Sequence, residues 1–289
     1  MSKLVSVILP NYNHEAFLQE RLDSIFNQTY QNYEVIILDD CSTDNSLKIL
    51  DRYKYHTKVS HFIVNTTNSG SPFKQWKKGL DLAQGDYIWI AESDDFCDFN
   101  FLESQLDYLK NVDVTVSETL TYCKGIKPKE VLHPLFKTGE SQVLTNDTIL
   151  NCPILNVSAV VFKAVDREQL KKCFFNEFNI IGDRVFYHEF FYNRSFTLNR
   201  ESTSYFRKDG SGLSDLSSKD SIYLSKYLKE HIRFIKESNT RSNNELKPFV
   251  KPYIKRFYNR VRHRVTYRGK LSFTYLKIYI SYKKALFTI

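Results

Sequence analysis

The chain has 289 residues, 42% of them hydrophobic and 26% charged, and a net charge of +8, which is the composition of a folded globular protein and not of a disordered one. Its five cysteines are odd in number and widely spread, and no C-x-x-C pair occurs, which favours reduced thiols over a disulfide framework. No apolar run reaches the roughly 20 residues of a membrane-spanning helix, and the first residues become polar too soon for a signal peptide, so we expect a cytoplasmic protein.

The first hundred residues alternate strand and helix patterns. Continuous apolar runs predict strands that are buried on both faces, and apolar residues at helical spacing predict amphipathic helices between them. We expect three helices in this part. The first begins near Glu15, and the second follows an N-cap at Ser42 or Thr43. The third begins at Pro72 and ends at Gly85. The expected strands are 4–9, 34–39, 59–64 and 86–91. This alternation predicts an α/β fold with a mostly parallel, doubly wound sheet.

The rest of the chain has a more mixed pattern. Residues 114–122, 158–163 and 196–208 are typical of strands, and residues 182–193 are typical of a helix rich in aromatic side chains. From about residue 219 the pattern is helical, basic and aromatic.

Polar residues follow three of the predicted strands: PNYN after the first, DDCSTD after the second and ESDD after the fourth. In an open α/β sheet, ligands bind at the carboxyl ends of the strands. The three polar segments therefore predict a ligand site at one edge of the sheet, and their coincidence carries more weight than any one of them.

The acidic segment AESDDF, residues 91–96, is the strongest of these signals. Glu92, Asp94 and Asp95 repel one another unless a cation lies among them. A divalent cation neutralises the charge that develops on a diphosphate leaving group, and Mg²⁺ or Mn²⁺ takes one or two protein carboxylates together with phosphate oxygens and water. The alternative is a solvated turn after a strand.

The other two segments are weaker signals. A strand-end Asp such as Asp40 can accept a hydrogen bond from a nucleobase or a ribose hydroxyl, but Asp40, Ser42 or Asp44 can equally cap the next helix. Tyr12 has a position from which it could stack on a base, and the alternative is an ordinary turn in which Asn13 caps the first helix.

The run VSVILPNYNHEAFLQERLDSIFNQTYQNYEVIILDDCSTDNS, followed by GDYIWIAESDD, resembles the family-2 glycosyltransferases of the GT-A fold. The similarity is dense over residues 4–106 and thinner from there to about residue 214. It implies a Rossmann-like domain in which residues 1–110 bind a nucleotide sugar and residues 111–215 bind the acceptor, followed by a basic helical segment over residues 216–289.

The resemblance also implies roles for single residues. Pro10, Tyr12 and Asp40 would hold the base, with Glu15 a weaker candidate. Asp94 would face the ribose or the metal, and Asp95 would ligate Mn²⁺ or Mg²⁺.

Two downstream segments extend the resemblance. In IIGDRVFY, Asp183 stands where the family has its catalytic base, a role that suits a carboxylate because it can take the proton of an acceptor hydroxyl. The alternative for Asp183 is a first-turn acid that is favourable to the helix dipole. SYFRKDGSGLS resembles the loop that closes over the donor diphosphate; Arg207 would bind phosphate there, and Asp209 replaces a frequent His as a weak candidate metal ligand.

The C-terminal segment has a charge of its own. Residues 219–289 hold 18 Lys and Arg against 4 Asp and Glu, which is +14 and leaves −6 for residues 1–218. Aromatic residues are mixed with these bases, so the segment is either a helical subdomain packed on the body or a surface that lies on an anionic membrane. Interleaved bases and aromatics also suit single-stranded nucleic acid, but we expect no nucleic-acid partner.

Together these features predict a metal-dependent, inverting glycosyltransferase of cell-surface polysaccharide synthesis. It would move a sugar from a nucleoside-diphosphate sugar, with a UDP-sugar favoured, to a hydroxyl of a glycan or lipid-linked acceptor, in the cytoplasm or on the inner face of the membrane. A nucleotidyltransferase would carry a Gly-rich phosphate loop after the first strand, which PNYNHE is not. The remaining alternative is a non-catalytic binding protein, either a degenerate transferase or a binder of anionic polymers.

Overall fold

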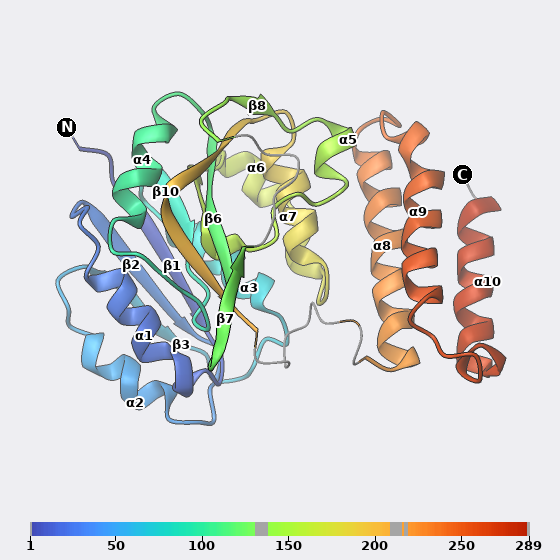
Figure 1. Ribbon diagram of the computed structural model, residues 1–289, viewed down its shortest axis with the longest axis horizontal. Coiled ribbons are helices and arrows are strands. Elements are labelled where there is room, and N and C mark those ends of the chain that lie inside the picture. Colours follow the sequence, from blue (N-terminus) through green and yellow to red (C-terminus); the bar gives the residue numbers. More distant parts are fainter. Residues whose placement is uncertain (1, 131–137, 209–215, 217–218, 288–289) are drawn as a thin grey trace. The chain divides into compact units, whose positions relative to one another are not determined.

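The structure is a computed structural model that describes residues 2–130, 138–208, 216 and 219–287. The chain divides into two compact units, residues 1–209 and 210–289. In the first unit helices cover a sheet, and the described part of the second unit consists of helices (Figure 1).

The described strands of the first unit form one sheet in the order β3-β2-β1-β4-β9-β6-β10-β5, with β7 beside β6 and β8 beside β10. The run β3-β2-β1-β4 is parallel, and antiparallel pairing begins where β9 joins β4. The strands are β1 (Val5–Asn11), β2 (Tyr33–Asp39), β3 (Val59–Val64), β4 (Tyr87–Ile90), β5 (Phe96–Cys97), β6 (Val114–Cys123), β7 (Ile126–Glu130), β8 (Gln142–Val143), β9 (Val160–Lys163) and β10 (Ser195–Arg207). The mostly parallel α/β sheet expected from the sequence is confirmed.

Helices lie on both faces of this sheet (Figure 1). They are α1 (Glu15–Phe26), α2 (Ser46–Leu50), α3 (Pro72–Leu82), α4 (Phe101–Leu109), α5 (Asn146–Ile149), α6 (Arg167–Lys172) and α7 (Gly182–Phe191), with short 3-10 turns η1 (Asp51–Tyr53), η2 (Val157–Ala159) and η3 (Phe175–Glu177).

The central strand β1 is buried along its whole length, as expected of a parallel strand covered on both faces. Val5, Val7 and Leu9 belong to one core cluster with apolar side chains of α1, α2 and α4. Ile8 points to the opposite face, where it packs so closely on α3 that a Cβ on Gly79 would lie 2.3 Å from Ile8 Cγ2. The alternation of side chains along the strand thus supplies two apolar layers.

Two details of the expected helices and one of an expected strand are wrong. The helix after β2 begins at Ser46, not beside Ser42 or Thr43, because the Ser42 hydroxyl instead donates to Asp39 Oδ1 at 2.6 Å. Helix α3 ends at Leu82, and Gly85 lies beyond it where a Cβ would be 2.6 Å from the backbone nitrogen of Ser6. Residues 158 and 159 form a 3-10 turn before β9 and are not part of the strand.

The second unit contains α8 (Ser221–Arg241), α9 (Lys247–Arg262), η4 (Gly269–Leu271) and α10 (Phe273–Phe287). Helices α8 and α9 pack through aromatic side chains: His231 stacks on Phe257 at 3.5 Å, and its Nδ1 lies 2.8 Å from the hydroxyl of Tyr253. The helical character expected from residue 219 onward is confirmed for the described residues. Among the described helices, none combines the length and the apolar composition that a membrane crossing needs.

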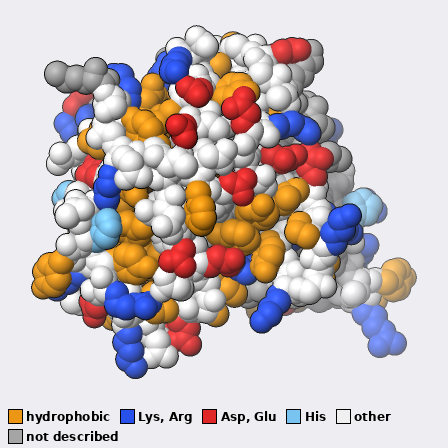
Figure 2. Space-filling model, turned by 60° about the vertical axis from the view of Figure 1, so that its left-hand side comes forward, with side chains coloured by type: hydrophobic (Ala, Val, Ile, Leu, Met, Phe, Trp, Pro, Cys, Tyr) orange, Lys and Arg blue, Asp and Glu red, His pale blue; other side chains and the backbone are white. Residues whose placement is uncertain are grey.

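Figure 2 shows one face of the molecule on which acidic and basic side chains are interspersed, with apolar side chains between them. This mixture fits the small net charge of residues 1–218. It contrasts with the composition of residues 246–289, which hold 12 Lys and Arg and no Asp or Glu.

Candidate active site

The polar segments singled out in the sequence lie at the carboxyl ends of β1, β2 and β4. These three strands are neighbours and run parallel, so their carboxyl ends share one edge of the sheet. A ligand of an open α/β sheet binds at this edge.

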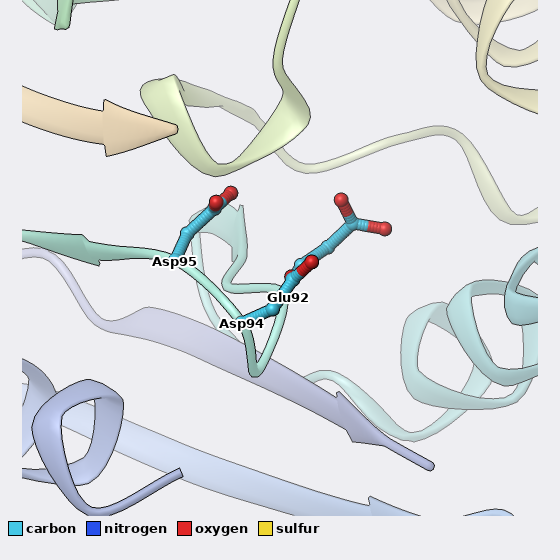
Figure 3. Close-up of side chains that lie close together, drawn as sticks. All are labelled: Glu92, Asp94 and Asp95. Carbon is cyan, nitrogen blue, oxygen red and sulfur yellow. The ribbon is translucent and has the colours of Figure 1, made fainter. Parts of the chain in front are cut away.

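Three carboxylates gather in the loop between β4 and β5. Glu92, Asp94 and Asp95 each offer one oxygen atom, and these atoms lie within 4.8 Å of one another. The three side chains project to the same side of the loop (Figure 3). Asp95 is buried, while Glu92 and Asp94 are partly exposed, so the group opens toward solvent on one side.

The electrostatics of this group favour a cation. Burial, followed by the charge of Asp94, raises the pKa of Asp95 from 3.8 to about 7. Burial also raises the pKa of Glu92 well above 4.5, and the charges of Asp94, Asp95 and Asp183 add to that rise. A divalent cation among these carboxylates would offset both the cost of burying their charge and their mutual repulsion. The arrangement therefore fits Mn²⁺ or Mg²⁺.

One buried cation lies beneath the acidic loop. Arg21 of α1 is fully buried, its Nε donates to the carbonyl oxygen of Glu92 at 2.8 Å, and its guanidinium lies 5.2 Å from the ring of Trp89. Its charge lowers the pKa of both Glu92 and Asp95 and so partly offsets the mutual repulsion of the carboxylates. Arg21 thus stabilises the acidic loop through a hydrogen bond to its backbone and through its positive charge.

Arg207, at the end of β10, also donates hydrogen bonds to the acidic loop. Its backbone N–H donates to Asp95 Oδ1 at 3.0 Å, and its Nε donates to the carbonyl oxygen of Asp94 at 2.8 Å. The guanidinium also pairs with Glu20 and lies over the rings of Phe17 and Tyr122. The Arg207 side chain is thus part of the scaffold of the acidic loop, and phosphate binding by it stays a prediction.

Three further polar contacts hold the loop and the strand before it. The hydroxyl of Ser158 accepts from the backbone nitrogen of Glu92 at 3.1 Å, and the carbonyl of Ser158 accepts from Trp89 Nε1 at 2.9 Å. Nδ1 of His14, in the turn after β1, lies 2.8 Å from the Ser93 hydroxyl. The acidic loop is therefore fixed by residues from α1, η2, β10 and the first strand-end turn.

Asp183 lies in the first turn of α7, near enough to the acidic loop for its charge to raise the pKa of Glu92. Its neighbour Gly182 allows the helix to start there: a Cβ at this position would lie 2.3 Å from Phe73 Cδ2 and 2.8 Å from the carbonyl oxygen of Phe175. The glycine thus permits a close approach of the start of α7 to Phe73 and to η3.

Asp40 follows β2, and both oxygens of its carboxylate accept hydrogen bonds from other residues of the protein. Its Oδ1 accepts from Asn65 at 2.7 Å and from Gln75 at 2.8 Å, and its Oδ2 accepts from the Ser69 hydroxyl at 2.7 Å. The backbone nitrogen of Ser69 donates to both oxygens. Asp40 therefore ties the end of β2 to the segment that precedes α3, and its contact with a base stays a prediction.

The turn after β1 and the loop after β2 are joined to each other. Asn13, at a φ of 54°, accepts from the backbone nitrogen of Thr43 at 2.7 Å. Glu15 receives the backbone N–H of Asn45, and its own N–H donates to Asp44 at 2.9 Å, so Glu15 links the starts of α1 and α2. Its contact with a base stays a prediction.

The remaining predicted residues differ in exposure. Pro10 is buried within β1, opposite Leu38 of β2, while Tyr12 has an exposed ring at the edge of the sheet where a base could stack. The candidate metal ligand Asp209 lies outside the described residues. Arg21, Glu20 and Ser158 were not predicted, because their role depends on partners far away in the sequence.

Comparison with known proteins agrees with this geometry. Residues 6–163 match the family model described as Glycosyl transferase family 2. An uncharacterized glycosyltransferase of Haemophilus influenzae is 40% identical over 121 residues, 42% of this chain and 48% of the relative. The poly(ribitol-phosphate) beta-N-acetylglucosaminyltransferase TarS of Staphylococcus aureus is 33% identical over 154 residues, 52% of this chain and 25% of the relative. The chain thus spans about half or less of the length of these relatives.

Solved structures show the same fold. S. aureus TarS 1-349 in complex with UDP-GlcNAc matches with a TM-score of 0.60 at 21% identity, over 97% of this chain and 90% of that one. The mannosyltransferase PcManGT from Pyrobaculum calidifontis, in complex with GDP-Man and Mn²⁺, matches with a TM-score of 0.51 at 14% identity, over 97% of this chain and 82% of that one. At these identities the likeness shows the fold, which is the GT-A type expected from the sequence.

The family match covers more than half of the chain and includes the turn after β1, the loop after β2 and the acidic loop. This chain belongs to glycosyl transferase family 2.

Proposed function

We propose that this protein transfers a sugar from a nucleoside-diphosphate sugar, with a UDP-sugar favoured, to a hydroxyl of a glycan or lipid-linked acceptor, with inversion at the anomeric carbon. One observation carries the proposal: three carboxylates meet within 4.8 Å at the carboxyl edge of the parallel strands. A fourth, Asp183, shares their electrostatic environment. A transferase needs this combination, because it must neutralise a diphosphate and also deprotonate a hydroxyl.

Glu92, Asp94 and Asp95 are the residues that would hold Mn²⁺ or Mg²⁺. When bound, the ion supplies positive charge next to the departing diphosphate. The protein's own part is to keep the three carboxylates converged, which is supported by the hydrogen bond that Arg207 donates to Asp95 and by the one that Ser158 accepts from the backbone N–H of Glu92. The Mn²⁺ in the PcManGT complex supports a metal in this fold, although that relative is distant.

Asp183 is assigned as the base. Its carboxylate takes the proton of the acceptor hydroxyl as the hydroxyl oxygen forms a bond to the anomeric carbon, and the bond from that carbon to the diphosphate oxygen breaks. A single in-line displacement inverts the configuration at the anomeric carbon. The fold contributes by holding donor and acceptor in line.

The nucleotide is assigned to the ends of β1 and β2. The exposed side chain of Tyr12 offers a stacking surface, and the buried residues Pro10 and Asp40 lie at the carboxyl ends of the same two strands. The complex of TarS with UDP-GlcNAc supports a UDP-sugar. The TarS relative acts on poly(ribitol-phosphate) by its name, which supports a cell-surface polymer as the acceptor class here. A lipid-linked acceptor would also fit a peripheral location of the basic residues 219–289 on the inner face of the membrane.

Titration calorimetry tests the proposal. UDP, GDP, dTDP and CDP are titrated into the wild type and into Asp95→Asn, with Mn²⁺ and with EDTA. We expect one nucleotide to bind the wild type only with Mn²⁺ and not to bind the variant. Asp107→Asn is the matched control, since Asp107 is an exposed carboxylate of α4 paired with Lys110. Nucleotide binding that is unchanged by EDTA and by Asp95→Asn would contradict the proposal and favour the non-catalytic alternative.

A further inference from the structure

Helix α10 has two apolar faces, and only one of them is packed. Ile278 and Ala285 are buried in the second unit, where α10 contacts α8 and α9. On the other face, Phe273 is 70%, Leu276 48%, Ile280 55% and Phe287 84% exposed. Their spacing of three, four and seven residues places these four side chains in one row along the helix. We call this row the α10 stripe.

Exposed lysines border the α10 stripe. At 100° per residue, Lys277 and Lys284 lie along one edge of the stripe and Lys283 lies along the other. The ammonium group of Lys277 is 4.5 Å from the ring centre of Phe273, so this lysine lies against the apolar row at that ring.

The apolar surface continues into the turn before the helix. Leu271 is exposed, and with Phe273, Leu276 and Lys270 it lines a hollow of about 480 Å³ at the start of α10. A contiguous exposed apolar surface of this kind marks an interaction site.

We propose that the α10 stripe is a docking surface for an anionic lipid bilayer, with its apolar side chains in the acyl region and its lysines at the headgroups. The charges select this partner: residues 246–289 carry 12 Lys and Arg and no acidic residue, and anionic headgroups attract such a segment. An apolar row between lysines, on a helix that does not cross the membrane, is the pattern of an interfacial helix.

Two other occupants fit less well. A second copy of the chain would bring the same uncompensated positive charge to the interface and would be repelled. Single-stranded nucleic acid stacks its bases on aromatic rings and binds Lys and Arg through its phosphates. The aliphatic side chains of Leu276 and Ile280 provide neither a stacking surface nor a charge. The inference extends the proposed function in one respect only, because a surface-bound transferase would meet a lipid-linked acceptor.

Vesicle flotation with the full chain tests the docking surface. The wild type is mixed with phosphatidylcholine vesicles with and without phosphatidylglycerol. The double variant Phe273→Ser/Ile280→Ser removes apolar side chains that already face solvent, so it is expected to fold as the wild type does. Tyr55→Ser is the matched control, since Tyr55 is an exposed aromatic residue of the first unit.

We expect the wild type and Tyr55→Ser to float with the anionic vesicles, and the double variant to lose at least about tenfold in binding. Lys277→Gln/Lys284→Gln should weaken binding to the anionic vesicles alone. Equal flotation of wild type and double variant would overturn the proposal, as would no flotation of the wild type. A stripe-dependent dimer in light scattering would overturn it in favour of self-association. UDP titration of the double variant distinguishes a failure of this proposal from a failure of the proposed transferase function, because the α10 stripe is not expected to affect nucleotide binding.

Discussion

Replacing Asp95 by Asn should stabilise the metal-free protein at neutral pH. The Asp95 carboxyl is 1% exposed and lies beside Asp94, so ionisation is costly there. Asn has the same shape and cannot ionise, and its side-chain oxygen can still accept the backbone N–H of Arg207, which is 3.0 Å from Asp95 Oδ1. The substitution therefore removes a buried charge and keeps the hydrogen bond.

The magnitude follows from the pKa. Below pH 3.8, Asp95 is protonated in the folded and the unfolded chain, and no difference arises. Between pH 3.8 and about 7, the unfolded chain has lost the proton and the folded chain retains it, so the free energy of unfolding falls as pH rises. Each pKa unit corresponds to about 1.4 kcal/mol, so the full effect of the rise from 3.8 to about 7 is about 4 kcal/mol.

Urea unfolding in EDTA measures this effect. We expect Asp95→Asn and the wild type to have similar stability near pH 4, and the variant to be more stable near pH 8 by up to about 4 kcal/mol. Mn²⁺ should then raise the stability of the wild type at pH 8 and leave the variant unchanged. Asp107→Asn should follow the wild type throughout. A variant that is less stable than the wild type near pH 8, or a difference that does not change with pH, would refute the reasoning.

Three further substitutions probe other parts of the first unit. Gly182→Ala forces a Cβ to within 2.3 Å of Phe73 Cδ2; we expect a loss of about 1–3 kcal/mol in urea unfolding and, because Asp183 is displaced, a drop in kcat with donor affinity retained. Arg21→Met leaves the buried Asp95 and its neighbour Glu92 without their counter-charge, so the free energy of unfolding should fall by about 3–5 kcal/mol; unchanged stability would contradict the role of Arg21. Burial lowers the pKa of His188 from 6.5 to about 4, so stability is lost as pH falls from 6.5 to 4, by about 3 kcal/mol; the acid-induced loss should flatten in His188→Phe, as followed by denaturant titrations across that range.

The first four strands could be predicted from the sequence because each is a continuous apolar run between turn residues. The observed bounds of β3 are the expected ones, and those of the other three strands differ by at most two residues at either end. Helix α4 was missed: it follows the acidic segment directly, and Asn100 at its start makes no capping hydrogen bond through its side chain. The expected cap at Ser42 was wrong because Ser42 is used instead to join the ends of β1 and β2, which no local pattern reveals.

The site was predictable to the extent that it lies at strand ends. The acidic segment stands out because it follows a predicted strand, and the parallel sheet then predicts which other strand ends lie near it. The contacts that hold it were not predictable. A basic residue within an amphipathic helix, such as Arg21, is ordinarily exposed, and only the packing of α1 beneath the acidic loop reveals its burial. The same holds for Arg207, whose partners Asp95 and Glu20 are distant in sequence.

The bond between Arg207 and Asp95 has a consequence for the order of folding. It joins residues 112 positions apart, and strand β10 can reach it only after β6 has formed, since β6 and β10 pair side by side. Contacts of such long sequence separation form late, because the intervening chain must first be ordered. During synthesis, the strands β1 to β4 are complete long before β10 emerges. The nascent chain therefore carries the acidic segment without the backbone amide that binds Asp95, and the hydrogen bonds of the acidic loop are complete only when β10 docks.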